Sequence, residues 1–241
     1  MTTAVRITGN MCDGRLWSGG HGVLGRTLAE RRLVVADADT GRDKTIAAMA
    51  ARLLRDHPGP LLLIGFSMGG IVALEAARQA PAQIAAMVLI DSTAAADHPD
   101  RAAARPDQQA RVCAGALAQI VADELKPAYL AAANRDDTAH RALLLDMALR
   151  LGPEVFVSQS EALRTRPDLG AVVAAFVGPI LFLVGAEDML CPPAIHRTMA
   201  ERAQRATLRI VPGAGHMLPL EQPAVCAAAI ADWLDQEKST C

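Results

Sequence analysis

Short apolar runs alternate along the chain with longer stretches in which apolar residues recur at helical spacing. The short runs predict strands at residues 4–8, 33–36, 61–64, 86–90, 180–184 and 207–211. The longer stretches predict helices at residues 24–30, 45–55, 71–79, 194–204 and 223–235. Because the run at 61–64 is apolar at every position, we expect that strand to be covered on both faces. This alternation predicts an α/β fold, with a mostly parallel sheet and helices on both faces.

The pattern changes between residues 94 and 169, where no convincing strand occurs. This segment is rich in alanine, leucine and arginine, and residues 111–124 and 138–150 are typical of helices. We therefore expect a helical lid inserted before the last two strands, with a core of residues 1–93 and 170–241 and a cap of residues 94–169. Such a cap would cover the C-terminal edge of the sheet, where open α/β sheets bind their ligands.

Composition and charge narrow the range of partners. Of the 241 residues, 51% are hydrophobic, and the formal net charge of -2 comes without a concentrated basic stretch, so we expect no nucleic-acid partner. The apolar run at 180–184 is too short to cross a membrane, and residues 1–10 lack the pattern of a signal peptide. The five cysteines contain no CxxC pair, which predicts reduced thiols, no metal site and a cytoplasmic location.

The most informative motif is Gly65-Phe66-Ser67-Met68-Gly69. It matches G-x-S-x-G between a predicted strand and a predicted helix, the context in which a serine acts as a nucleophile. Side chains at the two glycine positions would collide with neighbouring backbone, so the turn needs glycine there and is expected to be strained. The helix that follows directs its N-terminus toward the serine and favours developing negative charge. These features predict Ser67 as the nucleophile.

A serine hydroxyl needs a base to take its proton, and the base needs an acid to orient it. Of the six histidines, His216 alone follows a late strand in a glycine-flanked loop. The acid is expected after the strand that follows the lid, where Glu187 and Asp188 both lie. We select Asp188 because a G-x-x-D turn places its carboxylate at the strand tip, and Asp91, after an earlier strand, is the alternative.

An oxyanion hole requires two further hydrogen-bond donors. One is expected to be the backbone N–H of Met68, directly after the nucleophile. The second is expected in the loop after the first strand, at Asn10, with Met11 as the alternative. We assign substrate contacts to Met11, Trp17 and Met217, although packing in the core is an equally good interpretation of Trp17.

The motifs of the chain resemble those of the α/β-hydrolase superfamily over nearly its whole length, and most of all those of its small, capped, carboxylesterase-like serine hydrolases. The motifs that carry this resemblance are Thr8-Gly9-Asn10-Met11, Gly65-Phe66-Ser67-Met68-Gly69-Gly70, Val184-Gly185-Ala186-Glu187-Asp188 and Gly213-Ala214-Gly215-His216-Met217. The resemblance implies hydrolysis through an acyl-enzyme with no cofactor. The chain departs from the family at Thr8-Gly9, where members often have His-Gly.

These observations predict a serine hydrolase that cleaves a carboxylic ester, or a closely related acyl bond, of a small to medium apolar substrate. The same three side chains could cleave a thioester, a lactone or a carbon–carbon bond next to a carbonyl, and a ligand-binding or receptor-like protein on this fold is an alternative of another class. The arginines of the lid could contact an acyl-carrier protein or an anionic substrate, although a solvated helix face is the preferred interpretation. These arginines are Arg101, Arg105, Arg111, Arg135, Arg141 and Arg150.

Overall fold

The computed structural model describes residues 2–125 and 129–239. In these residues the sheet consists of β1 (Thr3–Ile7), β2 (Val34–Asp37), β3 (Leu61–Phe66), β4 (Ile84–Ile90), β5 (Ile180–Gly185) and β6 (Ala206–Val211). Each strand overlaps one of the predicted apolar runs. The strand order is β2-β1-β3-β4-β5-β6 and every neighbouring pair is parallel, so the α/β fold is confirmed with a sheet that is entirely parallel.

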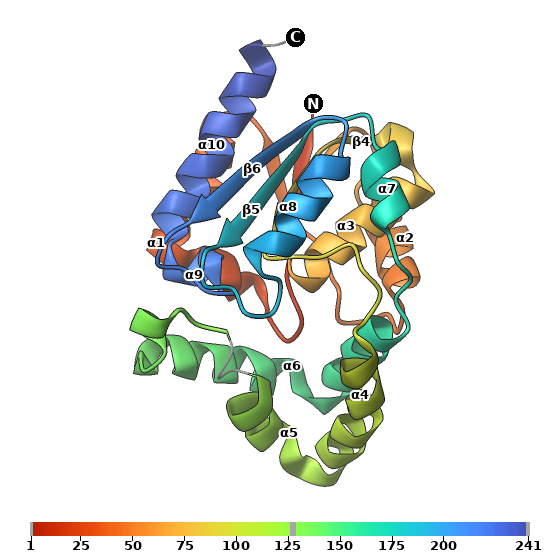
Figure 1. Ribbon diagram of the computed structural model, residues 1–241, viewed down its shortest axis with the longest axis vertical. Helices are drawn as coiled ribbons and strands as arrows, with labels where there is room; N and C mark the ends of the chain where they lie inside the picture. Colours follow the sequence, from red (N-terminus) through yellow and green to blue (C-terminus); the bar gives the residue numbers. More distant parts are fainter. Residues whose placement is uncertain (1, 126–128, 240–241) are drawn as a thin grey trace.

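Helices cover both faces of this sheet. The core helices are α1 (Gly19–Glu30), α2 (Ile46–Asp56), α3 (Met68–Gln79), α7 (Gly170–Ala175), α8 (Pro193–Arg202), α9 (Leu218–Glu221) and α10 (Pro223–Ser239), with short 3-10 turns η1 (Gly14–Ser18) and η2 (Pro81–Gln83). Helices α1 and α10 lie on one face, and α2, α3, α7 and α8 lie on the other (Figure 1). None of the helices in the described residues combines the length and apolar character needed to cross a bilayer.

The alternation of side chains along β3 shows why the strand is apolar throughout. Leu61 and Leu63 pack with α2 and α3, whereas Leu62 and Ile64 pack with α1 and α10. All residues of β3 are buried, as expected for a central strand with helices on both faces. The edge strands β2 and β6 are partly exposed, which explains why their apolar pattern is weaker in the sequence.

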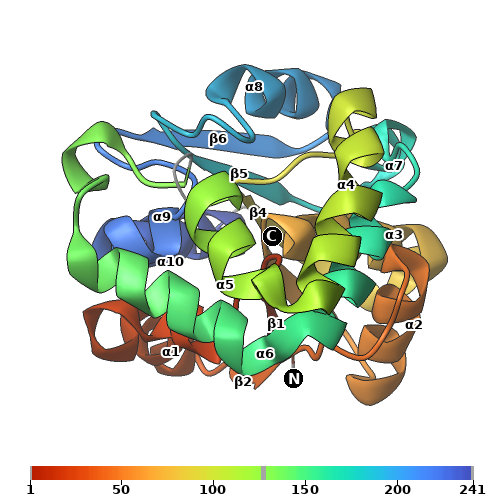
Figure 2. The same ribbon diagram turned by 90° about the horizontal axis from the view of Figure 1, so that it is seen from below.

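The segment between β4 and β5 is helical, as predicted, and consists of α4 (Pro99–Arg111), η3 (Val112–Ala116), α5 (Leu117–Gln119), η4 (Ile120–Leu125), η6 (Ala132–Asn134) and α6 (Thr138–Arg164). These helices lie at the end of the sheet to which the strands point (Figures 1 and 2). The helix predicted at 111–124 is instead a series of short, wide turns, because Gly115 has a φ of 97° that a regular helix does not allow. The helix predicted at 138–150 continues to Arg164 across a kink at Gly152 and Pro153.

The strand order creates a crevice at the C-terminal edge of the sheet. Strand β1 pairs with β2 on one side and with β3 on the other. The chain therefore leaves β1 toward β2 and leaves β3 toward β4, in opposite directions along the sheet. Such a switch point leaves room above the strand ends and is where open α/β sheets place their ligands. The loop after β1 and the turn after β3 therefore meet at this crevice, beneath the inserted helices.

Candidate active site

Ser67 lies on the turn that joins β3 to α3, at the C-terminal edge of the sheet. Its backbone has φ 51° and ψ −116°, a conformation that residues with a side chain rarely adopt. A Cβ on Gly65 would lie 2.4 Å from the carbonyl oxygen of Gly69, and one on Gly69 would lie 2.2 Å from the carbonyl oxygen of Ile7. The strained turn and the need for both glycines, predicted from the motif, are therefore confirmed.

Hydrogen bonds connect three side chains from distant parts of the sequence. His216 Nε2 lies 3.0 Å from Ser67 Oγ, and His216 Nδ1 lies 2.9 Å from Asp188 Oδ2. Asp188 follows β5 and His216 follows β6, so the parallel strands deliver both residues to the edge at which Ser67 lies. Asp188 and His216 are 1% and 4% exposed. The structure thus brings together the three residues predicted to be catalytic, at distances that permit proton transfer.

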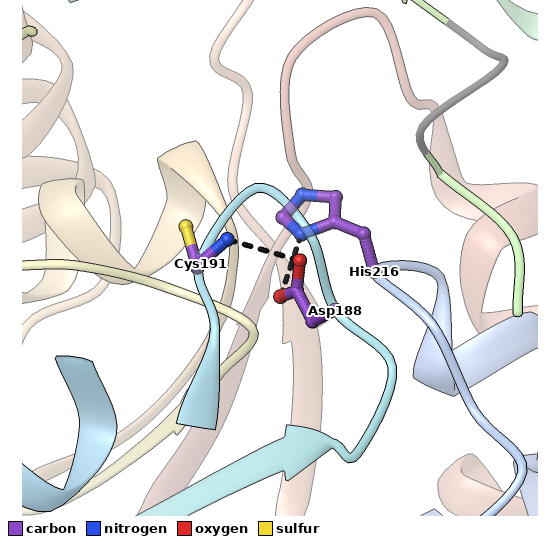
Figure 3. A group of neighbouring side chains, drawn as sticks. All are labelled: Asp188, Cys191 and His216. Atoms are coloured by element: carbon purple, nitrogen blue, oxygen red, sulfur yellow. Dashed lines mark hydrogen bonds and ion pairs between the residues drawn. The ribbon is translucent and has the colours of Figure 1, made fainter. Parts of the chain in front are cut away.

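The environment of Asp188 favours its charged form. Its Oδ1 accepts hydrogen bonds from the backbone N–H groups of Leu190 at 2.8 Å and Cys191 at 2.9 Å, while its Oδ2 faces His216 (Figure 3). Burial by itself would raise the pKa of Asp188, but the charge and hydrogen bond of His216 together with the two amides outweigh it and hold the pKa below its usual range. An ionised Asp188 keeps a proton on His216 Nδ1 and leaves Nε2 free to act as a base.

Asp91, the alternative acid, has a different role. Its Oδ1 accepts a hydrogen bond from the backbone N–H of Gly185 at 2.9 Å, and its Oδ2 accepts one from Leu218 at 3.3 Å. Burial, and then the neighbouring charge of Asp188, raises the pKa of Asp91 well above its usual range. Asp91 therefore joins the end of β5 to the loop after β6 and makes no hydrogen bond to the histidine.

Asp188 and His216, together with Cys191, also offer donor atoms within 4.8 Å of one another, close enough to hold a metal ion (Figure 3). Both oxygens of Asp188 already accept hydrogen bonds. Burial raises the pKa of the Cys191 thiol, so that it keeps its proton, whereas a metal-bound cysteine must lose it. The arrangement therefore favours proton transfer between serine, histidine and aspartate over metal binding.

Met68 and Asn10, the residues expected to supply the oxyanion-hole donors, both lie near Ser67. Met68 is the first residue of α3, so its N–H has no partner within the helix, and both Met68 and Asn10 line the same cavity as Ser67. The N–H of Met11 donates to Gln159 Oε1 at 2.8 Å, which favours Asn10 over Met11 as the second donor. Gln159 also accepts a hydrogen bond from the side chain of Asn10, 149 positions away in the sequence. Sequence reasoning missed Gln159 because a single glutamine in a helix carries no signal of so distant a partner.

A cavity of about 260 Å³ separates Ser67 from the inserted helices. Ser67, Met68 and His216 line its floor, and residues of α4, η4 and the end of α6 line its roof. Its apolar wall includes Leu125 and Leu163. The cavity thus places a partly open space, lined by both apolar and polar side chains, directly against Ser67.

The structure places the three predicted substrate contacts elsewhere. Trp17 and Met217, 3% and 0% exposed, pack in the core with α1 and α10. Met11, 1% exposed, packs against apolar side chains of the inserted helices. None of the three is among the described residues that line the cavity. These side chains adjoin the functional motifs in the sequence but turn into the protein interior, so the core interpretation of Trp17 is the one that the structure supports.

Two acidic residues connect the loops after β5 and β6 to the inserted segment. Glu221 accepts hydrogen bonds from the backbone N–H groups of Gly215 at 2.8 Å and Ala131 at 2.7 Å. Glu187, which the sequence offered as a possible catalytic acid, accepts one from Ala132 at 2.8 Å. Glu221 therefore holds the insertion against the histidine loop, and Glu187 holds it against the loop after β5. The sequence could not predict these roles because the partner amides come from a segment far away in the chain.

His196 supports the turn that contains Ser67 through hydrogen bonds that pass through Ser92. Its ring is fully buried, and its Nε2 accepts a hydrogen bond from the backbone N–H of Ser92 at 3.1 Å. The hydroxyl of Ser92 in turn donates to the carbonyl oxygen of Ser67 at 2.7 Å. Burial lowers the pKa of His196 from 6.5 to about 4, so the ring stays neutral in the folded protein.

We expect the free energy of unfolding to fall between pH 7 and pH 4, with His196 contributing about 3 kcal/mol of the loss. The pKa of His196 is lower in the folded than in the unfolded chain, so its stabilising effect is complete above pH 6.5 and is lost as the pH falls toward 4. Urea unfolding at a series of pH values measures this loss. The variant His196→Gln should show a flatter pH dependence, and the exposed control His21→Asn should not. An unchanged slope in His196→Gln would contradict the prediction.

The fold and the site together define a class of protein: a parallel α/β protein in which a strained serine turn, a histidine loop and a buried aspartate meet at the C-terminal edge of the sheet. A model of the alpha/beta hydrolase family matches residues 14–229. The chain belongs to this family, which confirms the resemblance inferred from its motifs.

Three relatives illustrate the likeness. A thermophilic esterase from Thermogutta terrifontis superposes with a TM-score of 0.87 at 26% identity, over 98% of this chain and 90% of that protein. Pimeloyl-[acyl-carrier protein] methyl ester esterase from Aromatoleum aromaticum is 30% identical over 79% of this chain and 80% of its own length. Human monoglyceride lipase is 28% identical over 77% of this chain, and the match spans 62% of that enzyme. The relatives of this chain therefore include esterases and a lipase.

Proposed function

We propose that this protein is a serine hydrolase that cleaves carboxylic esters of small to medium size through an acyl-enzyme. The observation that carries the proposal is the hydrogen-bonded series Asp188, His216 and Ser67, with 2.9 Å and 3.0 Å between the bonded atoms. Its serine lies at the N-terminus of α3 and lines the cavity beneath the inserted helices. A nucleophile, a base, an orienting acid and space for an acyl group are thus in one place.

The proposed reaction has two halves. In the first, Ser67 Oγ attacks the ester carbonyl while its proton passes to His216 Nε2, and the backbone N–H groups of Met68 and Asn10 bind the oxyanion. The carbon–oxygen bond to the alcohol then breaks, and the alcohol leaves with the proton from His216. In the second half, water gives a proton to His216 and attacks the acyl-enzyme, which releases the acid and restores the serine. Each step uses only groups of this chain and water.

We also propose that residues 94–169 act as a cap that selects the substrate, because α4, η4 and the end of α6 form the roof of the cavity. Replacement of the helical roof would change substrate choice without touching Ser67. The relative from Aromatoleum aromaticum is named for an ester carried on an acyl-carrier protein. Thioesters, lactones and acyl-carrier-protein esters therefore belong beside simple esters in a substrate panel.

A fluorophosphonate probe tests the proposal directly. We expect it to label Ser67 rapidly, because the probe reports a serine that a neighbouring base has activated. Peptide mapping by mass spectrometry should locate the adduct on Ser67 and leave Ser92 unmodified. Heat-denatured protein is the control. Labelling of the native protein no faster than of denatured protein would contradict the proposal and favour a ligand-binding protein that has kept the fold without turnover.

A further inference from the structure

The cavity above Ser67 has an uneven distribution of charge. One side of its roof carries three arginines, Arg101 and Arg105 from α4 and Arg166 from the segment just after α6. Asp97, at the start of the insertion, is the acid next to them. Helix α4 lies with the other inserted helices at the end of the sheet to which the strands point (Figure 2), and its two arginines line the cavity there.

Asp97 is shared between two of these arginines. Its carboxylate, 1% exposed, accepts a hydrogen bond from Arg105 Nε at 2.6 Å and lies 3.0 Å from Arg166 Nη1. The side chains of Arg105 and Arg166 are themselves only 15% and 7% exposed. Among the described residues, two guanidinium groups share this one carboxylate, which leaves one positive charge without a counterion in a largely buried position. Such a charge is costly unless another anion approaches it.

Arg166 forms its hydrogen bonds and its ion pair within the insertion. It donates hydrogen bonds to the carbonyl oxygens of Ala95 at 3.0 Å, Ala96 at 3.3 Å and Leu163 at 3.3 Å, in addition to its ion pair with Asp97. These contacts join the first residues of the insertion to its last helix. Four of the five N–H groups of Arg166 thus have partners within the insertion, whereas the two arginines of α4 keep more donors for a ligand.

The two arginines of α4 retain free donors. Arg105 bonds to Asp97 through Nε and Nη2, and its Nη1 has no hydrogen bond among the described residues. Arg101, one helical turn earlier, is exposed and takes part in none of the ion pairs within 4.0 Å in the part of the chain that the structure describes. At i and i+4 the two side chains project from the same face of the helix.

Glu124, which also lines the cavity, does not neutralise Arg101 and Arg105. Glu124, on η4, forms an ion pair with Arg111 at 2.6 Å and accepts a hydrogen bond from Gln108 at 3.0 Å. Its charge is thus balanced by a partner of its own. The excess positive charge on the α4 side of the cavity remains, and it borders the same cavity as Ser67.

We propose that Arg101 and Arg105 form a subsite for a carboxylate carried by the substrate, so that the preferred substrates are half-esters of dicarboxylic acids. This inference rests on the proposed ester hydrolysis and adds the substrate class to it. The free carboxylate of the half-ester supplies the missing counterion, and arginine binds a carboxylate through two parallel hydrogen bonds. The chain between the two carboxyl groups lies along the apolar wall near Leu125 and Leu163.

A matched pair of esters tests the subsite. Monomethyl glutarate carries a free carboxylate, and its monoamide analogue has the same shape without the charge. We expect the wild-type protein to hydrolyse the half-ester with a kcat/KM at least about tenfold above that of the amide, the size of effect typical of a lost charge-assisted hydrogen bond. In Arg101→Gln and in Arg105→Gln this ratio should fall toward one, and Arg101→Lys should retain part of it.

Arg141→Gln is the control, because Arg141 is an exposed arginine of α6 that does not line the cavity and its loss changes the net charge equally. Equal kcat/KM values of the wild type for the two esters would overturn the subsite and leave the proposed ester hydrolysis intact. An equal fall of the ratio in Arg141→Gln would also overturn it, since the preference would then come from the overall charge. If the wild type hydrolyses neither of the two esters and no neutral p-nitrophenyl ester, the proposed function is overturned as well.

Discussion

Replacement of Ser67 by alanine is expected to lower kcat/KM for p-nitrophenyl butyrate by about 10⁴-fold or more. The variant removes the oxygen that would attack the ester and leaves His216 and Asp188 hydrogen-bonded to each other. The residual rate would come from the oxyanion donors and from binding alone. Alanine keeps a Cβ at the positive φ of 51°, so the strain of the turn is unchanged and the melting temperature should change little.

Ser92→Ala is the matched control for this experiment. Ser92 is buried beside the turn and its hydroxyl donates to the carbonyl oxygen of Ser67 at 2.7 Å. Loss of that hydrogen bond should cost about 1 kcal/mol of stability and leave most of the activity. Retention of more than about one hundredth of wild-type kcat/KM by Ser67→Ala would exclude Ser67 as the nucleophile.

Asp188→Asn is expected to lower kcat by about 10⁴-fold, an effect close to that of losing the nucleophile. Asp188 Oδ1 accepts hydrogen bonds from two backbone N–H groups, so the amide oxygen of asparagine should take this position. The NH₂ group then faces His216 Nδ1, which must accept rather than donate. The proton of the neutral ring moves to Nε2, opposite Ser67 Oγ, where it prevents the ring from acting as a base.

Asp91→Asn separates this effect from the general loss of a buried carboxylate. The raised pKa of Asp91 favours its protonated form, which asparagine resembles in shape and charge. We expect Asp91→Asn to keep kcat within about tenfold of the wild type and to unfold at a slightly lower temperature, because one of two backbone amides loses its acceptor. Steady-state kinetics and thermal unfolding of both variants measure the difference. Equal losses of kcat in the two variants would contradict a specific orienting role of Asp188.

The agreement between sequence and structure is best where a residue's role depends on its immediate neighbours in the chain. Gly65 and Gly69 are required by the turn that contains Ser67, and the contacts that a Cβ would make show why. The strands were predictable for a similar reason, because burial on both faces demands an unbroken apolar run such as that of β3. The kink in α6 was missed because Gly152 and Pro153 interrupt the helical pattern, whereas the chain resumes a helix directly beyond them.

Agreement is poorest for side chains whose partners are distant in the sequence. Met11, Trp17 and Met217 adjoin the functional motifs, yet they point into the protein interior rather than into the cavity. Gln159 and Glu221 position the loops around the site through backbone amides far away in the chain. Side-chain direction and long-range pairing depend on how helices and loops pack, and no local pattern encodes either.

The sequence by itself determined the α/β fold, the helical insertion and the three residues that meet at the strand ends, because parallel strands deliver the loops that follow them to one edge of the sheet. The sequence selected Asp188 and left Asp91 as the alternative, and the tertiary structure shows that Asp188 bonds to His216 whereas the oxygens of Asp91 point to backbone amides. Only the tertiary structure decided that two arginines of α4 face the cavity rather than solvent alone. The physical reason is that a charge acquires its role from its neighbours in space, and the folded chain supplies those neighbours.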